Sequence, residues 1–238
     1  AFTGNKFEFR MLGSSESIAC ANVFLNTAVA EELCQFADEL EKSKDFQKDM
    51  QALVLKTIKE HKRIIFNGNG YDDAWVKEAE KRGLYNLKST PEALVHILDE
   101  KNKKLLEKHG VYSESELVSR FEIHNENYSK IINIEAQTMI DMTKKLILPA
   151  GSKYAKELAD TIVALDTAES GIDTTYQTSQ LKKVSSLVGG ISAKLQTLEQ
   201  AVSDVKSVTG AGEVAMYFRN KVFGAMNELR ANVDELEG

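Results

Sequence analysis

The sequence predicts a mainly α-helical protein, with one short strand near its start and an antiparallel helical hairpin at its end. Hydrophobic residues make up 42 % of the 238 residues, yet aromatic residues make up only 8 % and there are two prolines. This composition favours helices over a sandwich or a barrel. Apolar residues recur at steps of three and four along most of the chain, whereas residues 5–11 alternate strictly. We therefore expect a strand followed by a helical bundle.

The strand is predicted by the run Lys6-Phe7-Glu8-Phe9-Arg10. Because side chains of a strand alternate between its two faces, Phe7 and Phe9 would enter a core while the three charged residues share the opposite face. A carboxylate is a good ligand for a hard cation, and an arginine grips a phosphate or a carboxylate with two hydrogen bonds. The pattern fits a metal-and-anion site, although on the pattern alone a solvated strand with a surface ion pair is the favoured interpretation.

Helical spacing of apolar residues then predicts a helix from Ser17 to Leu40. Its first half is almost free of charge, so we expect that half to be buried. Cys20 and Cys34 lie fourteen positions apart on this helix, or about 21 Å, and cannot form a disulfide with each other while the helix persists. Two reduced thiols are typical of a cytosolic protein.

A second helix follows Asp45 and runs into the basic residues 61–63. Residues 64–70 contain two Asn-Gly pairs, which are strong turn signals. This loop could offer backbone amides to an anion, although a plain connector is the favoured interpretation. A short helix is expected from Asp72 or Asp73 to Arg82.

Thr90 and Pro91 predict the start of another helix, with Thr90 as its cap, that ends at His109. The four histidines fall on separate segments without metal-ligand spacing, and each is expected at a surface or a helix end: His61, His96, His109 and His124.

Ser113 and Glu116 have the spacing of a capping box, which predicts the start of a longer helix. We expect this helix to run to about Leu148, because Pro149 and Gly151 are residues that break helices.

The last third of the sequence carries two matching apolar stripes, one from Leu181 to Val208 and one from Val214 to Leu236, with a glycine-rich turn at 209–212 between them. Such stripes predict an antiparallel helical hairpin. Gly189-Gly190 lies within the first stripe and indicates either a kink or a close helix approach. The stripes can be the core of the hairpin or a surface that binds a partner.

Charge and hydropathy exclude several classes of function. The net charge is −6 and the isoelectric point is near 5.4, which argues against a general affinity for nucleic acid. No window approaches eighteen uninterrupted apolar residues, so we expect no membrane span. The sequence has no Walker motif and no Gly-x-Ser-x-Gly elbow. The candidate chemistry therefore reduces to Lys6, Glu8 and Arg10.

Several stretches resemble one enzyme family. Residues 5–10 are similar to the basic-x-Glu-x-Arg strand of glutamine synthetases, and residues 21–25 resemble the Ala-Asn-Pro-Tyr-Leu that opens the following helix. Residues 66–71 and 89–114 add to the likeness, and the whole chain resembles the C-terminal third of a type III glutamine synthetase. Two departures are that Leu12-Gly13 replaces the usual Pro-Asp and that Val23 replaces a proline.

The resemblance implies a ligase that phosphorylates glutamate with ATP and then lets ammonia displace the phosphate. It assigns Glu8 to a bound Mg²⁺ or Mn²⁺ ion, Arg10 to glutamate and the transferred phosphoryl group, and Lys6 to the nucleotide phosphates. Residues 1–148 would be the C-terminal part of the α+β catalytic domain, whose strand remnant is 5–11. Residues 149–238 would be the type III helical extension.

Two further expectations follow from the resemblance. The parent enzyme would be a cytoplasmic homo-oligomer built as a double ring, with glutamate, ammonia and ATP as its substrates. The chain starts at Ala1 without an initiator methionine, so we expect a processed protein or a fragment of a longer one. The resemblance implies that the other active-site residues lie upstream of Ala1, so we expect this chain to be inactive alone. The alternative is a stand-alone helical scaffold that binds a partner, or assembles, through the stripe from Leu181 to Leu236.

Overall fold

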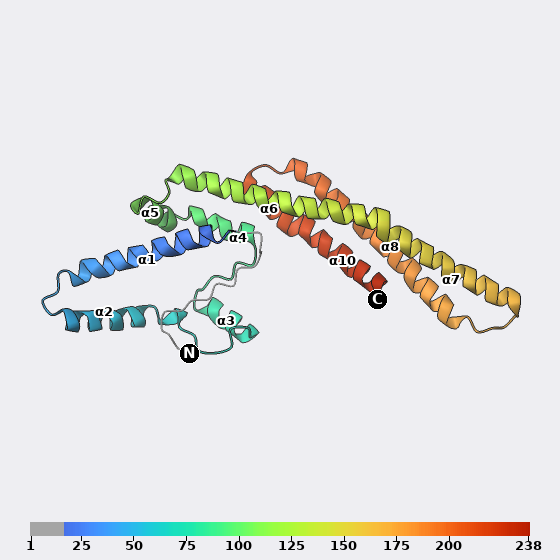
Figure 1. The fold of residues 1–238 in the computed structure, drawn as a ribbon, viewed down its shortest axis with the longest axis horizontal. Coiled ribbons are helices and arrows are strands. Elements are labelled where there is room, and N and C mark those ends of the chain that lie inside the picture. The colour runs from blue at the N-terminus through green and yellow to red at the C-terminus, as the bar shows by residue number, and fades with distance from the viewer. Residues whose placement is uncertain (1–16) are drawn as a thin grey trace. The chain divides into compact units, whose positions relative to one another are not determined.

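The computed structural model describes residues 17–238, and every regular element in this part of the chain is helical (Figure 1). The prediction of a mainly helical fold is therefore confirmed for these residues. The predicted strand at 5–11 lies outside them. The described chain divides into two compact units, one made of residues 17–86 and 99–117 and the other of residues 87–98 and 118–238.

The first unit begins with two helices that form a hairpin. Asp45 caps the second of them, because its side chain accepts a hydrogen bond of 3.3 Å from the amide of Lys48. Phe36 and Leu40 of the first helix line the same small apolar hollow as the buried Leu53 of the second. The elements of this unit are α1 (Ala19–Leu40), α2 (Phe46–Glu60), the 3₁₀ turn η1 (Lys62–Ile64), α3 (Asp73–Lys81) and α5 (Glu100–Lys108).

The expected burial of the first half of α1 is wrong. Leu25 is 40 % exposed and Val29 is 55 % exposed, while the small Thr27 is the buried residue of the helix. The Thr27 hydroxyl donates to the carbonyl of Val23 at 2.7 Å. A helix buries only the stripe that faces its neighbours, and within this unit α1 packs against α2 and α5. A helix with apolar residues on every face is therefore not necessarily buried on every face.

The helix α3 has the ends that the sequence predicts. The side chain of Asp72 accepts a hydrogen bond of 2.9 Å from the amide of Ala74 at its start. At its end Gly83 has φ +72°, a conformation that favours glycine, and the amide of Leu84 donates back to the carbonyl of Ala79.

The predicted single helix from Thr90 to His109 is wrong, because the chain forms three elements there. These are α4 (Thr90–Leu94), the 3₁₀ turn η2 (Val95–Leu98) and α5. Asp99 interrupts the helix, since its ψ of 136° is extended. Its carbonyl then accepts hydrogen bonds from the amides of Asn102 and Lys103, which starts α5 afresh. The cap of α4 is Ser89 and not Thr90.

The capping box at Ser113 is confirmed. The amide of Glu116 donates to the hydroxyl oxygen of Ser113 at 3.4 Å, and the amide of Ser113 donates to the carboxylate of Glu116 at 2.8 Å. The helix that starts here is α6 (Glu114–Met142).

The predicted helix end at Pro149 and Gly151 is wrong. A π-helical turn, η3 (Thr143–Ile147), follows α6 directly and leads into α7 (Leu148–Ala168). Proline has no amide proton to donate, and here it follows a turn in which the regular hydrogen-bond ladder is already interrupted. The division of the chain at 148 and 149 into a catalytic part and an extension stays a prediction.

Gly151 is a packing residue of the second unit. A Cβ atom placed on it would lie 2.7 Å from Cγ2 of Val188 and 3.2 Å from Cδ2 of Leu236. The missing side chain therefore lets α7 lie close to two other helices of this unit.

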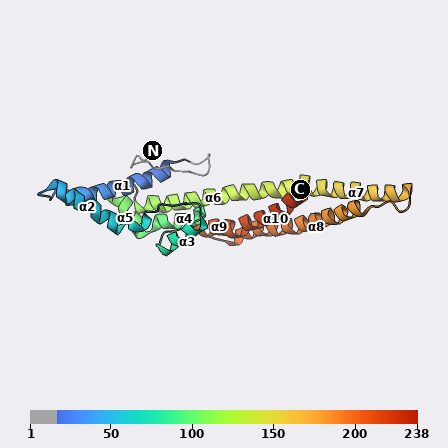
Figure 2. The same cartoon turned by 90° about the horizontal axis from the view of Figure 1, so that it is seen from below.

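The helical hairpin at the C-terminus is confirmed. Gly210, with φ +88°, precedes the second arm. In Figure 2 the helices α8 and α10 run along the line of α6 and α7, and α8 packs against both α7 and α10. The hairpin consists of α8 (Thr175–Asp204), the 3₁₀ turn η4 (Val205–Ser207), α9 (Ala211–Tyr217), the π turn η5 (Phe218–Val222) and α10 (Phe223–Glu237).

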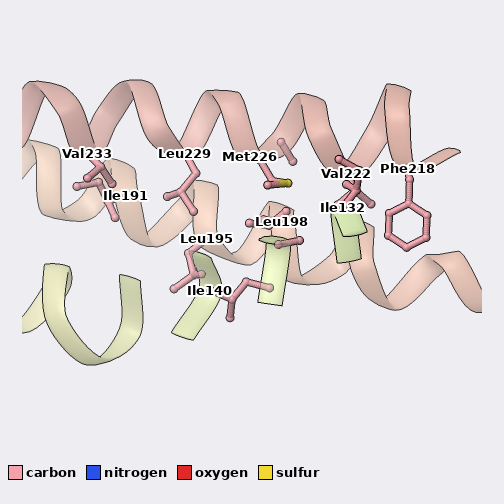
Figure 3. Close-up of a cluster of buried hydrophobic side chains, with 12 residues drawn as sticks. Ile132, Ile140, Ile191, Leu195, Leu198, Phe218, Val222, Met226, Leu229 and Val233 are labelled. Atoms are coloured by element: carbon pink, nitrogen blue, oxygen red, sulfur yellow. The ribbon is translucent and has the colours of Figure 1, made fainter. Parts of the chain in front are cut away.

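The core of the second unit lies between α6, α8 and the arm formed by η5 and α10, as Figure 3 shows. Leu198 and Leu229 are fully buried there, and each such side chain contributes about 1.5–3 kcal/mol to folding. The buried members of this cluster are Ile132, Ala136, Ile140, Ile191, Leu195, Leu198, Phe218, Val222, Ala225, Met226, Leu229 and Val233.

This core decides between the two interpretations of the apolar stripes. Ile191, Leu195 and Leu198 of the first stripe pack with residues of the second stripe within the unit. Most of the predicted stripe from Leu181 to Leu236 is therefore buried inside the hairpin. A residue that is already buried cannot also dock a partner. The stand-alone scaffold is therefore not favoured. Gly190 marks a close approach to Asn232, and α8 is continuous through it.

Candidate functional site

The three residues to which the sequence assigns chemistry, Lys6, Glu8 and Arg10, lie outside the described residues. Their roles and their mutual geometry stay predictions. Three other places in the described chain gather charged or polar groups: the loop after α2, the contact between α1 and α5, and a groove in the second unit.

Arg82 holds the loop after α2. Its guanidinium donates to the carbonyls of Arg63 and Ile65, at 3.3 Å and 3.1 Å, and pairs with the carboxylate of Glu78 at 2.8 Å. It also lies 5.3 Å from the centre of the Trp75 ring. The Arg82 hydrogen bond lowers the pKa of Glu78 below its usual value. Arg82 is thus occupied by the chain's own groups.

Two amides that directly follow the Asn-Gly loop are also occupied by the chain's own groups. The amide of Tyr71 donates to the side-chain oxygen of Asn69 at 3.1 Å, and the amide of Asp72 donates to the Asn69 carbonyl at 3.3 Å. Phe66 stacks on Trp75 with ring centres 3.8 Å apart. The amides of Tyr71 and Asp72 are therefore not free for an anion, and the connector stays the favoured interpretation of the loop.

The contact between α1 and α5 is built on one carboxylate. Glu31 accepts hydrogen bonds from Lys108 at 2.7 Å and from Gln35 at 3.0 Å, and its second oxygen lies 2.8 Å from Nε2 of His109. These hydrogen bonds, with that of Lys108 the strongest, lower the pKa of Glu31 to about 2. The Glu31 side chain is only 18 % exposed. The cluster ties two helices of the first unit together.

This cluster lacks the composition of a metal site. Lys108 brings a positive charge to the single carboxylate, and a cation competes with a metal ion for it. No group of three or more potential metal ligands gathers anywhere in residues 17–238. His109 and His61 follow the ends of α5 and α2, so the expectation of helix-terminal histidines is confirmed for these two.

The groove in the second unit has a volume of about 600 Å³ and lies between the α6–η3 segment and α10. Its apolar walls include Met139, Phe223 and Met226, and its polar residues include Glu135 and Arg230.

Several polar groups of the groove have partners within the chain. Arg230 pairs with Asp234 at 3.2 Å. The hydroxyls of Thr138 and Thr143 donate to backbone carbonyls one turn earlier. The groove offers an apolar surface rather than an activated nucleophile or base.

Residues 49–166, from α2 into α7, match the model of the glutamine synthetase C-terminal domain. The full chain is also 37 % identical to the type-3 glutamine synthetase of Dictyostelium discoideum, over 245 aligned residues. The chain belongs to the glutamine synthetase family. The resemblance found in the sequence is thereby confirmed.

Two bacterial glutamine synthetases are also similar along the whole chain. The protein of Butyrivibrio fibrisolvens is 35 % identical and that of Bacteroides fragilis (strain YCH46) is 28 % identical. The chain covers 33 % of the Dictyostelium protein and 34 % of each bacterial protein. It therefore spans about a third of the length of these relatives. No helix among residues 17–238 is long and apolar enough to span a membrane.

The sequence did not reveal the Glu31 cluster of this member of the glutamine synthetase family. Glu31 and His109 are 78 positions apart, and neither shows a spacing motif. The available signals were the Glu31 and Gln35 pair, one helical turn apart on α1, and the two basic residues at the end of α5, Lys108 within the helix and His109 directly after it. These signals point to local contacts only.

Proposed function

We propose that this chain is part of an enzyme that joins ammonia to glutamate with ATP. The observation that carries the proposal is similarity along the whole chain to three glutamine synthetases, at 28–37 % identity. Such a ligase first transfers the terminal phosphoryl group of ATP to the side-chain carboxylate of glutamate. Ammonia then attacks the acyl carbon, a carbon–nitrogen bond forms, and phosphate leaves with the carbon–oxygen bond electrons.

Three residues near the start of the chain would serve this reaction. Glu8 would hold Mg²⁺ or Mn²⁺, Arg10 would bind glutamate and the phosphoryl group in transfer, and Lys6 would lie near the nucleotide phosphates. Arginine suits its role because its planar fork matches carboxylate and phosphate oxygens. When bound, the metal ion would neutralise charge on the phosphoryl group.

This chain offers only part of the ligand set that a Mg²⁺ ion needs. Mg²⁺ prefers octahedral coordination by oxygen, usually with one or two protein carboxylates and several waters or phosphates. Glu8 offers one carboxylate, and residues 17–238 add no cluster of metal ligands. We therefore infer that the remaining ligands come from other parts of the enzyme and that this chain alone makes no glutamine.

The test uses the full-length enzyme that contains this chain, assayed for glutamine formation from ATP, glutamate and ammonia. Glu8→Gln and Arg10→Lys should each lower kcat/KM by about a hundred-fold or more, as the loss of one transition-state contact does. Arg230→Lys, the same exchange on α10, is the control and should stay within about two-fold of wild type. Wild-type rates in both site variants would refute the assigned roles.

A second measurement tests the incompleteness of the chain. The 238-residue protein, mixed with ATP, glutamate, ammonia and Mg²⁺, should release no phosphate that depends on glutamate. Glutamine formation by this protein alone would contradict the inference about its missing ligands.

We also infer a cytoplasmic location, because neither Cys20 nor Cys34 of α1 forms a disulfide in the described part of the chain. Labelling of both thiols without prior reduction, in protein isolated from its native cell, supports this; a mixed disulfide at either thiol argues against it.

A further inference from the structure

The loop between η1 and α3 contains two adjacent Asn-Gly pairs, Asn67-Gly68 and Asn69-Gly70. In such a pair the backbone nitrogen of glycine and the side-chain carbonyl carbon of asparagine can close a succinimide ring. Glycine favours this closure, because it has no Cβ to block the approach and its backbone adopts many conformations. The connector interpretation uses these residues for a turn and leaves their reactivity unused.

We propose that this loop is a site of spontaneous deamidation, and that Asn67 reacts before Asn69. The nitrogen of Gly68 attacks Cγ of Asn67 and forms a carbon–nitrogen bond. The side-chain amide group leaves as ammonia, taking the proton of the Gly68 amide, and a succinimide remains. Water then cleaves one of the two carbon–nitrogen bonds of the ring, which gives aspartate or isoaspartate. The net reaction exchanges ammonia for water, and it needs no oxidant and no partner.

Hydrogen bonds distinguish the two asparagines. The side-chain oxygen of Asn69 accepts a hydrogen bond from the amide of Tyr71 at 3.1 Å, and its backbone carbonyl accepts one from the amide of Asp72 at 3.3 Å. Closing the ring at Asn69 requires its side chain and backbone to rotate away from these two bonds. No hydrogen bond of this kind holds Asn67 within the described part of the chain. Asn67 therefore reaches the reactive geometry more readily.

Packing explains why a glycine follows Asn67. A Cβ atom placed on Gly68 would lie 2.6 Å from Cζ of Phe66, whose ring stacks on Trp75 with ring centres 3.8 Å apart. A bulkier residue at this position would shield Asn67 from attack, but it would also displace the stacked ring. A Cβ atom on Gly70 would meet nothing within 4 Å. The aromatic stack thus keeps the reactive pair in the chain.

Both products change the chemistry of the loop. Each carries a carboxylate where the asparagine carried a neutral amide, so position 67 gains a negative charge. Isoaspartate also adds one atom to the backbone, because the chain then runs through the Cβ and Cγ atoms of this residue. The added atom directly precedes Gly68, whose backbone lies against the Phe66 ring.

The test follows both asparagines in the folded full-length enzyme during incubation at neutral pH. Trypsin cleaves after Arg63 and Lys77, so both asparagines lie in one peptide, 64–77, and fragment masses separate them. Asn67 should convert about two- to ten-fold faster than Asn69, the factor to which one hydrogen bond of ordinary strength corresponds. The isolated peptide 64–77 is the control, and its two asparagines should convert at similar rates because it has no fixed hydrogen bonds.

Two variants and a pH series sharpen the test. Asn67→Gln should stop conversion at position 67 and leave that at Asn69 unchanged, because the longer side chain would have to close a larger ring. Gly70→Ala should slow conversion at Asn69 alone, since its added Cβ hinders attack there and meets no other atom of the protein within 4 Å. The rate at Asn67 should rise with pH, because the attacking amide must lose its proton.

Three results would overturn the proposal. The first is an unconverted Asn67 in the folded enzyme after the isolated peptide has reacted. The second is conversion of Asn69 at the same rate as Asn67, or faster, in the folded enzyme. The third is an equal preference for Asn67 in the isolated peptide, because the hydrogen bonds of Asn69 would then not be its cause. The inference does not depend on the proposed enzyme activity, since only the masses of peptides are measured.

Discussion

Replacing Gly151 by alanine should destabilise the protein, although alanine is the better helix former. Removing a glycine from a helix interior gains about 0.5–1 kcal/mol. The added Cβ, however, would lie 2.7 Å from Cγ2 of Val188 and 3.2 Å from Cδ2 of Leu236. Overpacking of this kind costs about 1–3 kcal/mol, and Val188 cannot rotate away easily because β-branched residues in helices have one favoured rotamer. We expect a net loss of about 1–2 kcal/mol.

Gly189 provides the matched control. It lies inside α8, and a Cβ on it would meet nothing within 4 Å. Gly189→Ala should therefore gain about 0.5–1 kcal/mol. Thermal unfolding followed by circular dichroism should show a melting temperature lower by about 2–8 °C for Gly151→Ala and higher by about 1–4 °C for Gly189→Ala. Equal or greater stability of Gly151→Ala than of wild type would refute the close approach of the helices at Gly151.

Three other variants test the remaining contacts. The low pKa of Glu31, about 2 against 4.5 for the ordinary group, contributes stability that is complete above the ordinary value and is lost as the pH falls toward 2. Urea unfolding should therefore show Glu31→Gln less stable than wild type near neutral pH, with a difference that shrinks between about pH 5 and pH 2; a difference independent of pH would exclude the ionic contact. Ser113→Ala removes the cap of α6 and should cost about 1 kcal/mol in urea, and no loss would mean that Glu116 alone suffices. Leu229→Ala empties a fully buried site and should cost about 2–5 kcal/mol, whereas a loss below 1 kcal/mol would contradict its burial.

Capping and helix-breaking residues predicted several helix ends correctly. They failed where the surrounding backbone departs from a regular α-helix. Asp72, Gly83 and the Ser113 capping box mark ends that the chain forms with its own nearest residues. Pro149 misled the prediction, because a π turn before it accommodates the missing amide proton. The extended backbone of Asp99 was also not predictable, since aspartate is compatible with a helix interior or a break.

The sequence predicted the enzyme family but not the charged contacts between helices. A resemblance identified the family, because the stretches that carry it are runs of neighbouring residues. The contact of Glu31 with His109 could not be inferred, because it depends on how α1 and α5 pack and not on any spacing in the sequence. The exposure of Leu25 and Val29 was missed for the same reason: composition indicates that a helix can be buried, and only its neighbours decide how much of it is.

The π turn at Thr143–Ile147 has a consequence for how related sequences align. A π turn amounts to one inserted residue, which shifts everything after it by about 100° around the helix axis. Relatives that lack the insertion must show a single-residue gap within these five positions. If they have no gap there, a different face of α7, with Gly151 no longer at its centre, would have to meet α8. A single-residue gap at this place in an alignment would thus indicate that the relatives keep the same face of α7 against α8. Deleting one residue here should be more damaging than most substitutions.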